Sequence, residues 1–244
     1  MKKIPLAAFA FTAACGTSLL AERVPPSGYV AEENVSQTWS GKPAAKAERW
    51  PAPQPLFAKD LSNAGMRPGS WEYKDGVLAS KGNGYIWTKE AYGDFVLNLD
   101  FRVEEKTDTG VILRCTSNTR DWVQNSIEVQ IIPGERPNDK HNAGGIYDIA
   151  APSRAVEIVP GKWHHYTITA QGSKIQVVFD GERVTAIDLS EWKKAGQNPD
   201  GTKNKFKKAM AEAAREGSIG LQAHKTAAFR NIVIEPVNLE TPKK

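Results

Sequence analysis

Polar side chains that could bind or act on a ligand stand at alternate positions in strands that are otherwise aliphatic. Glu128 and Gln130 alternate with Ile127, Val129 and Ile131, so the polar pair occupies one face of a strand and the aliphatic residues the other. Such a sheet face can hydrogen-bond sugar hydroxyls, and nearby Trp or Tyr rings can pack against a pyranose. The plainer alternative is a solvated outer face, which is usual in antiparallel sheets. Polar residues in similar positions are Arg114, Gln222, His224, Arg230 and Asn231.

The signatures of several other reaction classes are absent from the sequence. It contains no Walker loop, no Gly-x-Gly-x-x-Gly opening a helix, no His-Glu-x-x-His and no Gly-x-Ser-x-Gly elbow. His164 and His165 are adjacent, so in a strand they point to opposite faces and cannot share one metal ion. Asp108 and Asp148 carry carboxylates that could touch Ca²⁺, but their spacing fits no calcium loop. We therefore expect no metal site and no cofactor.

The charge balance argues against a nucleic-acid partner. The 32 Lys and Arg residues and 28 Asp and Glu residues give a net charge of +4, and the two signs are mixed along nearly the whole chain. Nucleic-acid-binding proteins instead concentrate Lys and Arg in a stripe or patch. A carbohydrate is the partner that the polar strand positions favour.

Alternation with a period of two predicts the strands that must position these residues. Residues 95–101 alternate between apolar and more polar side chains, as a strand with one buried face should. Asp180-Gly181 is a two-residue hairpin signal. The other predicted strands are 109–115, 126–132, 163–170, 174–179, 182–187, 218–222 and 229–234. Short strands at this spacing, without βαβ alternation, predict an all-β sandwich or jelly roll of antiparallel strands.

One short helix is predicted near residues 203–216. Phe206, Met210 and Ala213 recur at helical spacing, and Gly217 is a natural C-terminal stop. The Lys-rich flank of this segment is expected to face solvent.

The first 21 residues have the pattern of an export signal. Lys2 and Lys3 precede an uncharged apolar run over 4–14, which is too short to span a bilayer as a helix. Cleavage after Ala21 would give a periplasmic or extracellular protein, whereas processing before Cys15 would attach a lipid, the one membrane contact that we expect. Residues 22–55 are rich in proline and predict a tether. The β-sandwich domain is expected over 56–238, followed by a tail over 239–244.

The seven tryptophans divide according to their sequence surroundings. Trp71 and Trp163 are expected in the core, and two others fall in the tether. The remaining three are expected as platforms for a sugar ring: Trp87, Trp122 and Trp192.

A series of short motifs runs in order along about residues 56–236. It includes Asp75-Gly76-Val77-Leu78, Tyr92-Gly93-Asp94-Phe95, Glu128-Val129-Gln130-Ile131, Gly220-Leu221-Gln222-Ala223-His224 and Phe229-Arg230-Asn231-Ile232. In this order the motifs resemble the 3-keto-disaccharide hydrolase domain family. The resemblance implies a concanavalin- or laminin-G-like β-sandwich, and cleavage of glycosides whose sugar carries a ketone at C3.

The chemistry implied by this resemblance differs from that of an ordinary glycosidase. Direct displacement uses two carboxylates across the glycosidic bond. A 3-ketone instead acidifies the C2 proton, so one base can start β-elimination of the glycosidic oxygen, and water can add afterwards. Such a route needs a base, a donor for the enolate oxygen and an acid for the leaving group.

Candidates for these roles come from the polar strand positions. Glu128 and His224 are the acid–base pair, without an assignment of which does which, and Arg114 is the candidate for stabilising the enolate charge. The candidates for holding the substrate are Gln130, Tyr147, Gln222, Asn231 and Trp122.

Two functions of other classes fit the same pattern. A non-catalytic, lectin-like carbohydrate-binding module can use this fold, and a structural adhesion domain could use the polar face to meet another protein. Fold alone does not decide among them.

Overall fold

The computed structural model describes residues 52–117, 121–134 and 140–237 of the 244-residue chain. The chain divides into two compact units, residues 1–40 and 41–244, and every described residue belongs to the second. The predicted leader with its alternative at Cys15, nearly all of the predicted tether and the predicted tail therefore lie outside the described residues.

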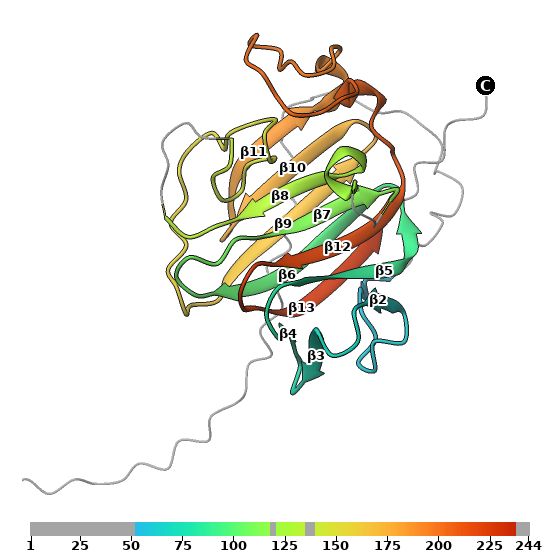
Figure 1. The fold of residues 1–244 in the computed structure, drawn as a ribbon, viewed down its shortest axis with the longest axis vertical. Coiled ribbons are helices and arrows are strands. Elements are labelled where there is room, and N and C mark those ends of the chain that lie inside the picture. Colours follow the sequence, from blue (N-terminus) through green and yellow to red (C-terminus); the bar gives the residue numbers. More distant parts are fainter. Residues whose placement is uncertain (1–51, 118–120, 135–139, 238–244) are drawn as a thin grey trace, which may run out of the picture. The chain divides into compact units, whose positions relative to one another are not determined.

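Two antiparallel sheets build the described unit (Figure 1). The larger sheet has the order β11-β10-β9-β6-β13-β4-β3, and β1 also pairs with β13. Its strands are β1 (Gln54–Pro55), β3 (Trp71–Lys74), β4 (Val77–Ser80), β6 (Phe95–Val103), β9 (His164–Gln171), β10 (Lys174–Phe179), β11 (Glu182–Asp188) and β13 (Ala227–Pro236). The smaller sheet has the order β2-β5-β12-β7-β8. Its strands are β2 (Ala64–Met66), β5 (Gly84–Tyr92), β12 (Gly217–Ala223), β7 (Thr109–Cys115) and β8 (Ile127–Ile131).

The predicted all-β sandwich of antiparallel strands is therefore confirmed. The first strand begins at Gln54, slightly before the expected start of the domain at residue 56, because Gln54 and Pro55 pair with Ile234 and Val233 of β13. The proline-rich surroundings of these two residues predict that they belong to the tether. Proline at an edge position is compatible with a strand, since its missing N–H does not break an internal ladder.

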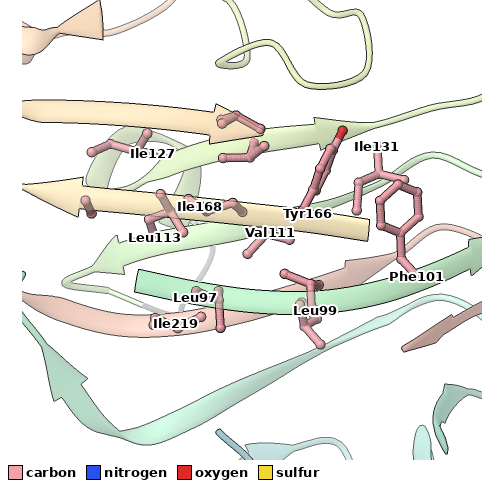
Figure 2. Close-up of a cluster of buried hydrophobic side chains, with 14 of the residues drawn as sticks. Leu97, Leu99, Phe101, Val111, Leu113, Ile127, Ile131, Tyr166, Ile168 and Ile219 are labelled. Atoms are coloured by element: carbon pink, nitrogen blue, oxygen red, sulfur yellow. The ribbon is translucent and has the colours of Figure 1, made fainter. Parts of the chain in front are cut away.

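The core lies between the inner faces of the two sheets (Figure 2). Leu97, Leu99 and Phe101 of the larger sheet face Val111 and Leu113 of the smaller one, and all five are fully buried. Their alternation with polar neighbours is the pattern that predicted the strands, so the side chains between them necessarily point to the outer faces.

The predicted hairpin at Asp180-Gly181 connects β10 to β11. Both residues adopt positive φ, 46° and 87°, as a type I′ turn requires. Asp75 and Gly76, with φ of 52° and 79°, connect β3 to β4 in the same way.

Two β-bulges interrupt the alternation. In β7, Ile112 pairs with Gly220 and Cys115 with Ser218, so two residues of β7 stand opposite a single residue of β12. Arg114 within this bulge has a φ of 51°. In β13 a second register shift lies between Arg230 and Val233, and it includes Asn231, also with a φ of 51°. A bulge of this kind redirects side chains, so simple alternation fails beyond it.

The predicted helix near residues 203–216 is wrong. Only the short 3₁₀-helix η3 (Met210–Glu212) forms there, and the other helices in the described ranges are η1 (Trp122–Asn125) and η2 (Leu189–Glu191). The backbone N–H groups of this segment bond to other elements: Lys205 to Asp148 Oδ2 at 2.7 Å, and Lys207 to Gln124 Oε1 at 2.9 Å. These tertiary bonds replace the i−4 carbonyls of a helix. None of the helices in the described ranges has the length and hydropathy needed to cross a bilayer.

The two tryptophans expected in the core differ in their burial. Trp71 is buried there, as predicted. Trp163 is only half-buried, and the guanidinium carbons of Arg102 and Arg230 lie 4.8 and 4.2 Å from the centre of its ring. Its neighbour His164 takes the buried side of the strand, so Trp163 has to point to the outer face of the larger sheet.

Candidate active site

The outer face of the smaller sheet carries cross-strand rows of side chains. In one row Gly65 pairs with Trp87, Trp87 with Gly220, Gly220 with Ile112 and Ile112 with Glu128. The row crosses all five strands. The two rows that follow it contain the pairs Tyr85–Gln222, Gly110–Gln130 and Asp108–His224. The register of the sheet thus brings together four of the predicted site residues: Glu128, Gln130, Gln222 and His224.

The side chain of Glu128 lies along this surface and does not project outward from it. A Cβ on Gly110 would come within 2.4 Å of Glu128 Oε1, so the carboxyl group lies over that glycine. Glu128 is 8% exposed, and its carboxyl has no hydrogen-bond partner among the described residues. Burial, and next the negative charge of Asp108, raise the pKa of Glu128 to about 8, while Lys205 opposes the shift. The group therefore changes protonation near neutral pH.

Gln130 and Asp108 are two polar side chains beside Glu128. Gln130 Nε2 donates to Asp108 Oδ1 at 3.2 Å. Gln130 is 2% exposed, and its Oε1 is buried with no hydrogen-bond partner in the described part of the chain. A buried acceptor of this kind is costly to the folded state unless a ligand or water satisfies it. The free acceptor position can receive a hydrogen bond from a hydroxyl group.

Tyr147 and Lys205 lie on the other side of Glu128. The backbone N–H of Tyr147 donates to the Glu128 carbonyl at 2.9 Å, which extends the sheet past β8. Lys205 Nζ lies 2.6 Å from the Tyr147 hydroxyl and 3.9 Å from the centre of its ring. His141 also packs on Tyr147, with ring centres 4.7 Å apart, and its Nε2 is 3.4 Å from Asp148. A positive charge is therefore fixed next to the buried carboxyl.

Gln222 and His224 lie on β12 and just beyond it. Gln222 Nε2 is 3.2 Å from His224 Nε2 and 3.4 Å from the Tyr85 hydroxyl. Gln222 is buried, whereas His224 is exposed. His224 therefore has solvent access for proton exchange while its ring is oriented by the protein.

Three aromatic rings cover the remaining part of this face. Tyr85 and Trp87 are stacked with ring centres 5.9 Å apart, and Trp122 of η1 lies 5.4 Å from Tyr85. Trp87 lies flat over Gly220, because a Cβ there would be 2.4 Å from its ring. Trp122 and Trp87 are largely buried by one another, and Tyr85 is the most exposed of the three. The third predicted platform, Trp192, is in the main core instead, with its Nε1 bonded to Asn198 Oδ1 at 2.9 Å.

Arg114 does not lie at this site, contrary to the sequence-based prediction. The bulge in β7 turns its side chain away from the outer face. Its guanidinium donates to Gly93 O at 2.9 Å and Gly172 O at 2.6 Å, and pairs with Asp94 Oδ1 at 2.8 Å. Arg114 is 1% exposed, and these bonds connect β7 to the loop from β5 to β6, which joins the two sheets, and to the loop between β9 and β10 of the larger sheet. Its role is structural.

Asn231 also lies away from the site. It belongs to β13 in the larger sheet, and its side-chain amide donates to Asp100 Oδ2 at 2.8 Å. The same carboxylate accepts from Arg230 Nε at 3.0 Å and lies 2.8 Å from His165 Nδ1. These contacts hold the second bulge, and they place Asn231 on a different sheet from Glu128.

Sequence reasoning missed several residues of the site. Lys205 was assigned to a helix, and Tyr85 lies in β5, a strand that was not predicted. Asp108 was considered only as a calcium ligand. Gly110 and Gly220 carried a usable signal, because a glycine inside a strand marks a close approach of another group.

Among the described residues, no group of three or more His, Cys, Asp or Glu side chains is arranged to hold a metal ion. Asp108 lies beside Glu128, whereas Asp148 is bound to His141 and to the Lys205 backbone.

Comparison with known proteins identifies the family of this chain. The sequence model of a family described as the 3-keto-alpha-glucoside-1,2-lyase-like domain matches residues 38–235. The chain belongs to this family. The predicted resemblance is therefore confirmed, and the family match includes all of the site residues described above. No curated protein matches the chain.

Solved structures agree with the family assignment. A proposed glycosyl hydrolase from Parabacteroides distasonis is 36% identical, with a TM-score of 0.71 over 76% of this chain and 99% of that one. A second proposed glycosyl hydrolase from the same organism is 17% identical, with a TM-score of 0.60 over 74% of this chain and 91% of its own. A laminarinase from Flavobacterium sp. UMI-01 is 10% identical, with a TM-score of 0.50 over 78% and 100% of the two chains, and shares the fold alone. The chain is thus a member of a carbohydrate-active family with a concanavalin-like jelly roll.

Proposed function

We propose that this protein is an exported enzyme that cleaves glycosides whose sugar carries a ketone at C3, by β-elimination followed by addition of water. The observation that carries the proposal is Glu128, a buried carboxyl with a pKa raised to about 8, lying in a polar sheet face. A carboxylate of raised pKa is a stronger base than an ordinary one, which suits removal of a carbon-bound proton. The description of the family as lyase-like supports the same chemistry.

The reaction starts when ionised Glu128 removes the proton at C2. The electron pair of that C–H bond moves into an enolate whose negative charge rests on the C3 oxygen. Collapse of the enolate forms a C1–C2 double bond and breaks the bond between C1 and the glycosidic oxygen, which leaves with a proton from His224. Water then adds to C1 and a proton returns to C2, so the net reaction is hydrolysis.

Lys205 and Tyr147 take the role that the sequence assigned to Arg114. They lie on the side of Glu128 that faces away from β7, whereas His224 lies across β7 on the opposite side. In this orientation the C3 oxygen of the substrate meets the Lys205 ammonium and the Tyr147 hydroxyl, and the glycosidic oxygen meets His224. A fixed positive charge at a developing oxyanion stabilises the transition state more than the ground state.

Gln130, Asp108 and Gln222 hold the remaining hydroxyls of the sugar. Gln130 Oε1 has a free acceptor position inside the site, and its Nε2 is oriented by Asp108. Gln222 is oriented by Tyr85 and His224. Side chains held in place by neighbours bind a substrate at a smaller entropic cost than mobile ones.

The deciding experiment compares a 3-keto-glucoside with its unoxidised parent. We expect release of the leaving alcohol from the keto form alone, and loss of that release in Glu128→Gln. Glu72→Gln is a matched control, because Glu72 is an exposed carboxylate on β3 of the other sheet. Elimination also predicts exchange of the C2 proton with solvent deuterium.

Other outcomes would assign other functions. Release from both substrates would indicate conventional hydrolysis, with Asp108 and Glu128 as the two carboxylates. Binding of both sugars without release would indicate a lectin-like module. Wild-type rates in Glu128→Gln would remove this residue from the mechanism.

Export is a separate part of the proposal and rests on the apolar run after Lys2 and Lys3. Cell fractionation of the full chain tests it. Retention of the protein in the membrane fraction that is lost in Cys15→Ser would assign lipid attachment, whereas a cytoplasmic protein with an intact N-terminus would contradict export.

A further inference from the structure

An open hollow adjoins the polar face on the side of His224. It has a volume of about 570 Å³ and lies between the edge strand residues 65–67 and the segment 83–85, with Trp87 and His224 completing its lining. His224 therefore borders both the hollow and the polar group around Gln222. Glu128 and Lys205 lie at the far end of the same face. In the orientation proposed above, whatever is attached to the glycosidic oxygen enters this hollow.

Two of the polar side chains that line the hollow are partly engaged by the protein. Arg67 Nη2 donates to Asn83 O at 3.3 Å, and Asn83 Oδ1 accepts from the Lys225 backbone at 2.7 Å. Most of the surface that remains for a ligand is apolar, and it includes the Tyr85 ring and the Met66 side chain. A sugar in the hollow would need several hydroxyls satisfied, whereas a flat apolar ring needs only contact area.

We propose that the hollow is the leaving-group subsite, and that it selects an aromatic leaving group over a second sugar. This inference rests on the proposed cleavage of 3-keto-glycosides and adds the identity of the group released. Tyr85 supplies the stacking surface, and its stacked partner Trp87 holds that ring in place, with centres 5.9 Å apart.

Gly65 offers a way to close the hollow without disturbing the reacting groups. It lies on the edge strand β2, paired with Trp87, and a Cβ built on it meets nothing within 4 Å. Its φ lies outside the left-handed region, so a side chain causes no backbone strain there. A leucine at this position therefore projects into the hollow while the strand pairing is kept.

The test uses three 3-keto-glucosides that release unactivated alcohols: methanol, 2-phenylethanol and glucose linked through its primary hydroxyl. We expect the wild-type KM for the 2-phenylethyl compound to be about tenfold below that for the methyl compound, the scale of one good aromatic contact. Gly65→Leu should cancel this advantage and leave the rate on the methyl compound within about twofold. Gly93→Ala is a control glycine substitution, since its Cβ would have an ordinary contact of 3.7 Å and lies away from the hollow.

The outcomes separate the two proposals. Cleavage of all three compounds with equal KM, or a glucosyl compound preferred over the 2-phenylethyl one, would overturn the aromatic subsite and leave the cleavage reaction standing. Absence of release from every keto compound would overturn the cleavage reaction. In that case binding of 2-phenylethanol itself, followed by NMR of the Tyr85 and Trp87 rings, still tests the subsite: saturable binding that is lost in Gly65→Leu supports it, and no binding contradicts it.

Discussion

The carboxyl group of Glu128 lies over Gly110 on the neighbouring strand, where a Cβ would come within 2.4 Å of Glu128 Oε1. The same Cβ would also be 2.9 Å from Glu128 Cγ and 3.0 Å from the backbone oxygen of Val129. The position of the proposed base therefore depends on the absence of a side chain at a residue that takes no part in the chemistry.

Gly110→Ala should reduce kcat by about a hundredfold, because a displacement of the base by roughly 1 Å has an effect of that size. Binding of a substrate analogue should change much less. Steady-state kinetics on a 3-keto-glucoside measures the effect, with Gly93→Ala as the control. A variant with normal kcat and normal folding would show that the carboxyl does not act from this position.

The pH dependence should report the ionisation of Glu128. Since the base must be deprotonated, kcat/KM should rise with pH, with a midpoint near the pKa of about 8. Asp108→Asn removes a negative charge that raises this pKa, so the midpoint should move to lower pH.

Lys205→Met removes a positive charge that lowers the same pKa, so the midpoint should move to higher pH, in addition to any loss of rate. pH–rate profiles of the wild type and both variants provide the measurement. Shifts in the same direction for Asp108→Asn and Lys205→Met would contradict the electrostatic arrangement.

Glu128 should also make the fold less stable as pH rises. In the unfolded chain its pKa is near 4.5, whereas in the folded protein it is about 8. Between these values the folded state holds a proton that the unfolded state has released, so the free energy of unfolding falls as pH increases. The accumulated loss is on the order of 5 kcal/mol at pH 8.

Glu128→Gln has no such ionisation, so its stability relative to wild type should increase by this amount between pH 4.5 and pH 8. Urea unfolding of both proteins at the two pH values measures the difference. A constant difference across this range would mean that the buried carboxyl titrates normally.

Arg114→Met should lower stability instead of disabling the chemistry directly. The substitution leaves the half-buried Asp94 without its 2.8 Å partner and removes two bonds to backbone carbonyls. A cost of about 3 to 5 kcal/mol is expected for breaking one partner of a buried pair. Thermal unfolding checks this, and kcat of the folded protein at low temperature should stay close to wild type. A stable Arg114→Met protein with strongly reduced kcat would instead support the role that the sequence suggested.

The regular parts of the sheets were predictable from the sequence because alternation is a local property. Glu128, Gln130 and Gln222 share the outer face of the smaller sheet as their strands indicated. Alternation failed at Arg114 and Asn231 because each lies in a bulge with a φ of 51°, where an extra residue moves the following side chains to the other face. For Asn231 there is a second reason, since β13 belongs to the larger sheet and alternation does not say which sheet a strand joins.

The contribution of Lys205 could not be predicted from its own segment. Its neighbours have helical spacing, but the backbone there is held by Asp148 and Gln124, which are distant in the sequence, and by Gly196 of the preceding loop. Only a three-dimensional arrangement places this ammonium group beside Glu128. Similarly, Trp192 has a side chain that is suited to stacking on a sugar, yet its indole is fixed in the core by Asn198.

The two glycines under flat-lying side chains have a consequence for how the family can diverge. Gly110 accommodates Glu128 and Gly220 accommodates Trp87, whose ring carbons would be 2.4 Å from a Cβ at that position. Each glycine and the side chain above it should therefore change together during evolution. Relatives that have larger residues in place of both glycines are expected to have lost enzymatic activity while keeping the jelly-roll fold. The residues at these two positions therefore offer a simple sequence marker that separates active from inactive branches of the family.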